Sequence, residues 1–145
     1  MSAEWKEVVA EWRGNTAFIG KNLMGGAVQM GEVDGRPGIS PMELLLTGLA
    51  GCTGVDVALI LGKKRQPLDD LQVRVRGKRA DQHPKVYTEI EIEYLLWGEG
   101  LSEKAIEQAI ALSEEKYCSA SAMLGAKAQI NSTYRILAPG EAFRK

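Results

Sequence analysis

The chain has few of the residues that build metal centres and disulfide scaffolds. Its 145 residues include only two cysteines, Cys52 and Cys118, and one histidine, His83. Two cysteines are too few for the disulfide framework of a small secreted protein, and this set is too sparse for a metal site of usual composition. We therefore expect no metal ion or other cofactor. In a reducing compartment, a disulfide here would be catalytic or regulatory rather than structural.

An excess of charge of one sign is also lacking. The chain has 18 Lys and Arg against 19 Asp and Glu, for a formal net charge of −1. This balance gives no general attraction for a polyanion. Nucleotide binding has no support either, because no glycine-rich loop follows a strand and opens a helix. A basic strip in one predicted strand faces an acidic row in the next, and cross-strand pairing explains both rows. The strip is Arg74, Arg76, Lys78 and Arg79, and the row is Glu89, Glu91 and Glu93. We expect no nucleic-acid partner.

No signal peptide is predicted, because the first residues lack a basic segment followed by an apolar one. The expected location is therefore the cytoplasm. Residues 44–61 are apolar except for Asp56. This run falls short of the roughly 20 residues that cross a membrane, and an aspartate inside a span is costly. We expect a buried core helix and no membrane partner.

The helix starts are the clearest local signals. Ser40, Pro41 and Glu43 form a capping box with a proline at the first helical position, which predicts a helix to about Gly62. Ser102 caps a second helix with helically spaced apolar residues. Period-two patterns and turn residues predict the strands. The other expected elements are strands at 4–13, 16–20, 27–30, 68–80, 86–97 and 126–137, and a short helix at 119–124.

This order of elements predicts a single domain over residues 1–145. The length is enough to bury a core of its own. Runs of strands separated by helices are typical of the α+β class. We expect antiparallel sheet packed against a long central helix and a second helix.

Cys52 lies in the middle of the long helix, among three glycines. Each glycine inside a helix costs about 1 kcal/mol relative to alanine, so something must compensate. Gly48 lies one turn before Cys52, and a face of small residues allows a helix, a partner subunit or a substrate to approach closely. The alternative is a small buried hydrophobe, since free cysteine is among the most buried residue types. Both interpretations remain open.

Cys118 precedes Ser119, a plausible N-cap of the short helix. A thiol at a helix N-terminus is expected to have a lowered pKa, because the amide dipoles favour the thiolate. The alternative is a residue at a helix corner, packed beside Tyr117. Neither cysteine lies in a CxxC motif, and their separation does not show whether they meet.

These motifs resemble the OsmC/Ohr family, named after the osmotically induced protein C and the organic hydroperoxide resistance protein. The residues that carry the resemblance are 40–44 (SPMEL), 48–52 (GLAGC) and 115–119 (EKYCS). The likeness is greatest to the OsmC-like branch typified by YhfA. The resemblance implies an intertwined α+β homodimer, with the long helix at its centre and active sites at the interface.

The resemblance also implies a mechanism. Cys52 would be the peroxidatic cysteine, whose thiolate attacks the O–O bond of a small organic hydroperoxide and becomes a sulfenic acid. Cys118 would resolve the sulfenic acid as a disulfide, which an external dithiol reduces. Both steps follow ordinary thiol chemistry. The alternative is a non-enzymatic dimer on the same scaffold that binds a small apolar ligand or senses thiol oxidation.

Two positions depart from the family pattern. The family's catalytic glutamate directly follows the proline, but here Met42 occupies that position and Glu43 comes one residue later. A shift of one residue turns a side chain by about 100° around a helix, so Glu43 is expected either to assist the thiolate or only to cap the helix. The family also uses an arginine, for which Arg36 is the candidate and Arg13 a weaker one.

Overall fold

The computed structural model describes residues 4–142 and divides the chain into two compact units, residues 1–45 and 46–145. The mixture of helices and strands confirms the α+β class expected from the sequence. The single-domain organisation stays a prediction.

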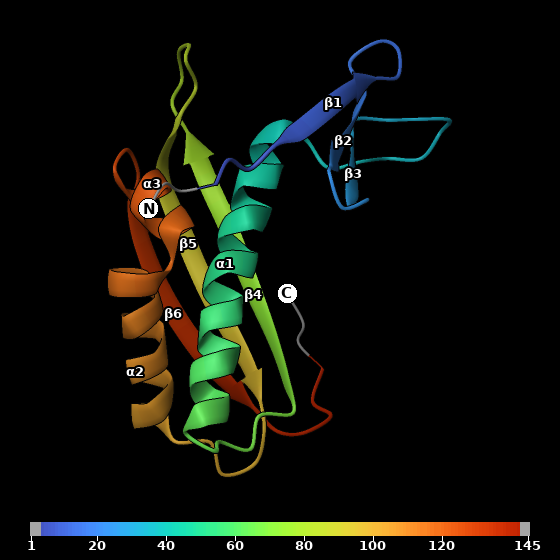
Figure 1. Cartoon of the computed structure of the whole chain (residues 1–145). Coiled ribbons are helices and arrows are strands. Elements are labelled where there is room, and N and C mark those ends of the chain that lie inside the picture. Colours follow the sequence, from blue (N-terminus) through green and yellow to red (C-terminus); the bar gives the residue numbers. More distant parts are fainter. Residues whose placement is uncertain (1–3, 143–145) are drawn as a thin grey trace. The chain divides into compact units, whose positions relative to one another are not determined.

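The first unit is an antiparallel meander of β1 (Val8–Trp12), β2 (Phe18–Asn22) and β3 (Ala27–Met30), in the order β1-β2-β3 (Figure 1). Phe18 lies opposite both Trp12 and Met30, which makes one face apolar. Among the described residues of this unit, only Ala17 is buried. The unit therefore buries little apolar surface of its own. Before residue 41, its exposed large apolar side chains are Trp5, Val8, Val9, Trp12, Phe18, Leu23 and Met24.

The second unit contains a sheet in the order β4-β5-β6, formed by β4 (Asp70–Arg79), β5 (Tyr87–Trp97) and β6 (Gln129–Leu137). β4 and β5 pair antiparallel, but β5 and β6 pair parallel, so the expectation of antiparallel sheet is wrong for the last strand. Between β5 and β6 lie α2 (Glu103–Leu112), the π-helix η1 (Ser113–Tyr117) and α3 (Ser119–Gly125). A helical crossover of this kind returns the chain in the direction of the strand it left.

Helix α1 (Pro41–Lys63) and α2 lie over the same face of this sheet (Figure 1). Residues four apart on α1 form its buried row, because they stack on one side of a helix. From β5, alternate apolar residues complete the core, as period two requires. The buried residues between the helices and the sheet include Leu49, Thr53, Val57 and Leu61 of α1, Ala105, Ile106, Ala109 and Ile110 of α2, and Ile90, Ile92, Tyr94 and Leu96 of β5.

The capping box predicted for α1 is confirmed. The Ser40 backbone N–H donates to Glu43 Oε1 at 2.9 Å, and the Glu43 N–H donates to Ser40 Oγ at 3.1 Å. These bonds satisfy two of the amide donors that a helix start leaves without intrahelical partners. The helix ends at Lys63, one residue beyond the predicted end.

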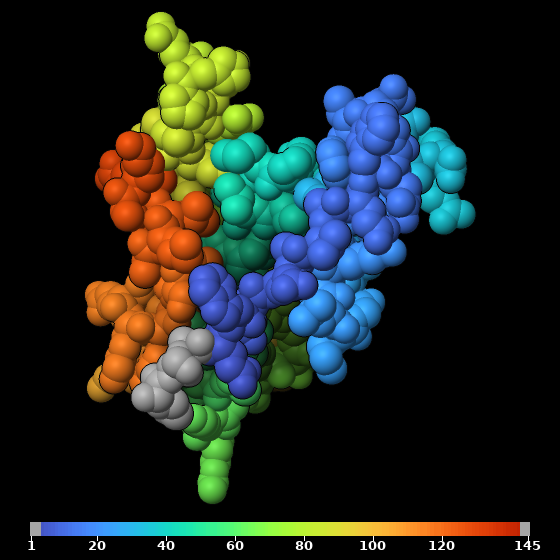
Figure 2. All heavy atoms as spheres, turned by 45° about the horizontal axis from the view of Figure 1, so that its top comes forward, coloured from blue at the N-terminus to red at the C-terminus, as the bar shows by residue number. Residues whose placement is uncertain are grey.

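α1 is long and apolar enough to cross a membrane by length and composition alone, with a mean hydropathy of 2.0 over its most apolar window. One such helix is weak evidence, since the core helix of a soluble protein passes the same test. Its atoms, teal to green, reach the surface in Figure 2. Leu45, Val55 and Leu59 are exposed on it, so α1 has apolar faces beyond the one that covers the sheet.

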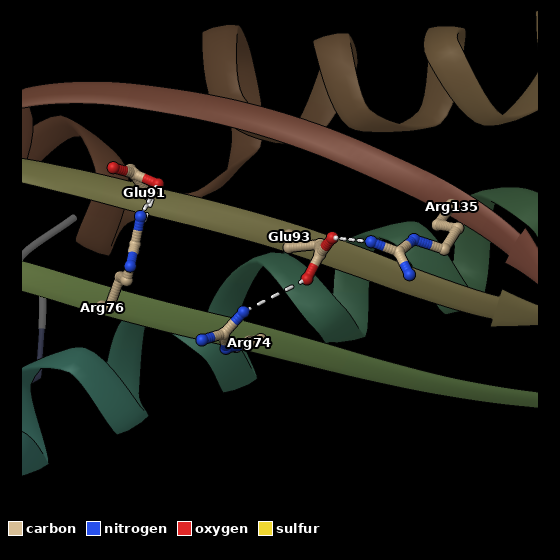
Figure 3. Close-up of polar contacts among 5 residues, drawn as sticks. All are labelled: Arg74, Arg76, Glu91, Glu93 and Arg135. Carbon is tan, nitrogen blue, oxygen red and sulfur yellow. Dashed lines mark hydrogen bonds and ion pairs between the residues drawn. The ribbon is translucent and has the colours of Figure 1, made fainter. Parts of the chain in front are cut away.

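The opposite face of the second sheet carries charged side chains (Figure 3). Arg76 pairs with Glu91 at 2.8 Å, and Glu93 lies between Arg74 at 3.6 Å and Arg135 at 3.3 Å. These contacts confirm the predicted cross-strand pairing of the basic and acidic rows. Exposed pairs of this kind contribute little to stability, so their main effect is to neutralise the surface locally.

Candidate active site

Cys52 lies on α1, directly before the buried Thr53, and is itself half-buried. The small residues near it leave open space: a Cβ added at Gly48 or Gly51 would meet no atom within 4 Å, apart from the helix backbone itself. Among the described residues of the second unit, the side of α1 at Gly48 and Gly51 therefore has no close neighbours. This matches the predicted face of small residues.

Cys118 lies where η1 ends and α3 begins, and only 3% of it is exposed. Its backbone N–H donates to Ser113 O at 2.7 Å, which closes the π-type turn. Its Sγ accepts a bond from the Ser121 backbone N–H at 3.3 Å. Cys118 is thus itself the N-cap of α3, whereas the sequence suggested Ser119. Single π-turns are rare and are frequent at functional sites.

The two thiols come together in the second unit. The Cys52 thiol lies near enough to the Cys118 thiol to act on its pKa, and both cysteines are free rather than joined in a disulfide. The sequence left open whether the cysteines meet, and the fold answers this. Their roles as peroxidatic and resolving residues stay predictions.

Burial raises the pKa of the Cys118 thiol, and the Cys52 thiol raises it further. The Ser121 side chain and backbone N–H act in the opposite direction and lower it. The lowered pKa expected from a helix N-terminus is therefore wrong in net direction. Desolvation disfavours the charged form more than the few amide dipoles of a short helix favour it.

We expect a brief exposure to iodoacetamide at neutral pH to alkylate Cys52 and to spare Cys118. Cys118 is buried and its pKa is raised, so it presents little reactive thiolate, whereas Cys52 is half-buried. Peptide mapping by mass spectrometry would locate the adduct. The guanidinium-unfolded protein, in which both cysteines should react, is the control. Modification of Cys118 before Cys52 would contradict this order.

A buried polar network lies beside the thiols. Thr53 Oγ1 contacts the Tyr94 hydroxyl at 2.7 Å and Ser113 Oγ at 2.8 Å. The Tyr94 hydroxyl donates to Glu114 Oε2 at 2.5 Å, and Ser113 Oγ donates to Asp56 Oδ2 at 2.9 Å. Burial and the Glu114 carboxylate raise the pKa of Tyr94, so its hydroxyl keeps its proton for this bond.

This network connects the segments that carry the two cysteines. Thr53 is the neighbour of Cys52 on α1, and Ser113 provides the carbonyl to which the Cys118 N–H donates. Tyr94 joins them from β5. A satisfied buried network holds a unique arrangement, because breaking one bond leaves a polar group without a partner. We infer that it fixes α1 against η1 near the thiols.

Sequence reasoning missed these network residues. Thr53 and Tyr94 occupy core positions of a helix and a strand, where the periodic pattern of apolar residues predicts burial but no hydrogen-bond partner. The available signal was a polar side chain inside an otherwise apolar row, since buried hydroxyls normally have a hydrogen-bond partner. The identity of that partner depends on contacts between distant segments.

Glu43 and Arg36, the predicted helpers, belong to the first unit. The cap bonds with Ser40 lower the pKa of Glu43. Arg36 lies in a tight turn, where its backbone N–H and C=O pair with Val33. The thiols belong to the second unit, so the assistance of Glu43 and Arg36 to Cys52 stays a prediction. No group of three potential metal ligands occurs within residues 4–142.

Comparison with known proteins adds a family match. The family described as OsmC-like protein matches residues 33–133. Protein YhfA of Escherichia coli (strain K12) is 33% identical over 128 residues, which are 88% of this chain and 96% of that protein.

Solved structures share the fold. A hypothetical protein from Aquifex aeolicus VF5 is 42% identical, with a TM-score of 0.84 over 94% of this chain and 98% of its own. The organic hydroperoxide resistance protein OhrB of Bacillus subtilis has a TM-score of 0.62 over 91% of this chain and 98% of its own. At 15% identity, that second likeness shows the fold alone.

Proposed function

We propose that this chain, which belongs to the OsmC-like protein family, is a thiol-dependent peroxidase that reduces organic hydroperoxides. Cys52 is the peroxidatic thiol and Cys118 the resolving thiol. The observation that carries the proposal is the proximity of the two thiols, since the Cys52 thiol acts directly on the Cys118 thiol and both are free. The fold likeness to a protein named for organic hydroperoxide resistance supports the choice of substrate class.

The roles follow from exposure. Cys52 is half-buried on an apolar helix with open space beside it, whereas Cys118 is buried. A peroxide therefore reaches Cys52 first. The thiolate sulfur attacks the O–O bond, an alcohol leaves, and the sulfur becomes a sulfenic acid. An apolar approach suits an organic hydroperoxide better than hydrogen peroxide.

Cys118 then attacks the sulfenic sulfur. The S–S bond forms, the S–O bond breaks, and the oxygen leaves as water with the thiol proton. An external dithiol reduces the disulfide by thiol–disulfide exchange and restores both thiols. The proximity of the two thiols within one chain favours an intramolecular disulfide.

Treatment of the reduced protein with one equivalent of cumene hydroperoxide tests the proposal. We expect both free thiols to disappear and the intact mass to fall by the two hydrogens of a disulfide, at monomer mass on a non-reducing gel. A disulfide-linked dimer would contradict resolution within one chain. Unchanged thiols would refute the peroxidase and favour a scaffold that binds a small apolar ligand.

Glu43 and Arg36 are proposed to assist Cys52, and Glu43→Gln separates that role from capping. The amide oxygen still accepts the Ser40 N–H, so the cap remains while the negative charge is lost. We expect peroxide consumption to slow by about tenfold, the effect of one charge-assisted hydrogen bond. The matched control, Ser40→Ala, should cost about 1 kcal/mol of stability and keep the rate. An unchanged rate in Glu43→Gln would make Glu43 a cap only.

We further propose that the protein is a cytoplasmic homodimer. The first unit exposes one apolar sheet face, and α1 exposes Leu45, Val55 and Leu59. Exposed apolar patches of this extent are typical of association surfaces. The family consists of soluble proteins, which supports burial of these residues against a second copy rather than in lipid. Sedimentation equilibrium should give twice the monomer mass.

A further inference from the structure

We propose that Ser121 is a further catalytic residue, whose buried hydroxyl donates a hydrogen bond to the Cys118 thiolate when Cys118 attacks Cys52. This rests on the proposed function, because it takes Cys118 as the resolving thiol. It goes beyond that function in assigning the group that stabilises the second nucleophile.

The first observation is an unused donor. Ser121 is only 7% exposed, and its Oγ has no hydrogen-bond partner of ordinary geometry among the described residues. It is the one buried side-chain polar atom of residues 4–142 left in this state. A buried hydroxyl without a partner costs free energy, so its presence calls for a physical reason.

The second observation is position. The Ser121 backbone N–H donates to Cys118 Sγ at 3.3 Å, which fixes residue 121 beside the sulfur. The hydroxyl of Ser121 also acts on the Cys118 sulfur and lowers the pKa of this thiol. In the resting thiol the sulfur already accepts the Ser121 N–H, and a neutral sulfur is a weak acceptor. A thiolate is a far stronger acceptor. The Ser121 hydroxyl therefore forms a strong hydrogen bond to Cys118 Sγ only after the Cys118 thiol has lost its proton.

The surroundings show why such a donor is needed. Cys52 on α1 is the titratable group that acts on Cys118, and it disfavours the Cys118 charge. Tyr94 on β5 also faces Cys118, and Cys118 helps to raise the pKa of Tyr94, so that its hydroxyl stays neutral. The Tyr94 hydroxyl is bonded to the carboxylate of Glu114 on η1, which adds a negative charge to the surroundings of Cys118. No cation is among the groups that act on the Cys118 sulfur in the described part of the chain. The Ser121 hydroxyl and N–H are therefore the groups that offset burial of the thiolate.

Two-step release of thionitrobenzoate from Ellman's reagent tests this without peroxide. With one equivalent of reagent on the reduced full-length protein, Cys52 attacks the reagent disulfide and releases the first thiolate. Cys118 then attacks the mixed disulfide on Cys52 and releases the second. The second phase isolates the step assigned to Ser121.

In Ser121→Ala we expect the second phase to slow by about tenfold at neutral pH, and its pH profile to move upward by about one unit. The first phase should keep its rate. The thermal midpoint should stay or rise, because the variant removes a hydroxyl that lacks a partner in the resting protein. Ser119→Ala is the matched control, since Ser119 is an exposed serine on the same helix and should leave both phases unchanged.

The assignment fails if Ser121→Ala keeps the parent's second phase and pH profile, or if Ser119→Ala slows it equally. It also fails if Ser121→Ala lowers the thermal midpoint and slows both phases, which would indicate a structural role. A parent protein that shows only one phase overturns it, because Cys118 then does not attack at Cys52. A parent with both phases that consumes no cumene hydroperoxide refutes the proposed function and leaves the role of Ser121 standing.

Discussion

Replacement of Cys52 by serine is expected to reduce the consumption of cumene hydroperoxide to the rate of buffer alone. A serine hydroxyl stays protonated at neutral pH and, unlike a thiolate sulfur, cannot take up the peroxide oxygen to become a sulfenic acid. Cys52 is half-buried beside open space on α1, whereas Cys118 is buried, so no other thiol of the chain is equally placed. A coupled assay with dithiothreitol, or direct assay of remaining peroxide, would measure the loss.

The matched variant is Cys118→Ser. It keeps the peroxidatic thiol and should complete one rapid turnover, after which Cys52 remains as a sulfenic acid that dimedone can trap. Steady turnover with a dithiol should slow, because an external thiol must then resolve Cys52 directly. Full activity in Cys52→Ser, or loss of the first turnover in Cys118→Ser with an intact fold, would reverse the assigned roles.

Tyr94→Phe is expected to lower the free energy of unfolding by about 2 kcal/mol, or roughly 5–8 °C in thermal midpoint for a protein of this size. Tyr94 is fully buried, and its hydroxyl holds Glu114 at 2.5 Å and Thr53 at 2.7 Å. Phenylalanine keeps the ring packing and removes both bonds. A partly buried carboxylate oxygen then loses its donor, which costs more than the loss of a neutral bond.

Two control variants separate the contribution of the Tyr94 hydroxyl from that of a single bond in the network and from that of an exposed hydroxyl. Thr53→Val leaves Tyr94 bonded to Glu114 and Ser113 bonded to Asp56, so it should cost about half as much. Tyr117→Phe removes a hydroxyl from a side chain that is 52% exposed and should change stability little. Thermal and urea unfolding would measure all three. Equal losses in Tyr94→Phe and Tyr117→Phe would show that the network adds no stability.

The sequence by itself determined the elements whose causes are local. The capping box at Ser40 and Glu43 placed the start of α1, and period-two alternation placed β4 and β5 within about two residues. It also singled out Cys52 and Cys118, because thiols are rare in this chain. These signals act over a few residues, so they can be read without knowing the partners.

Only the tertiary structure decided what depends on distant segments. It set β6 parallel to β5, made Cys118 the N-cap of α3, and brought that thiol to Cys52. Burial then raised the pKa of Cys118, against the expectation from the helix terminus alone. A pKa follows from every group around the atom and from the water removed from it, and that environment exists only once α1, β5 and α3 have packed together.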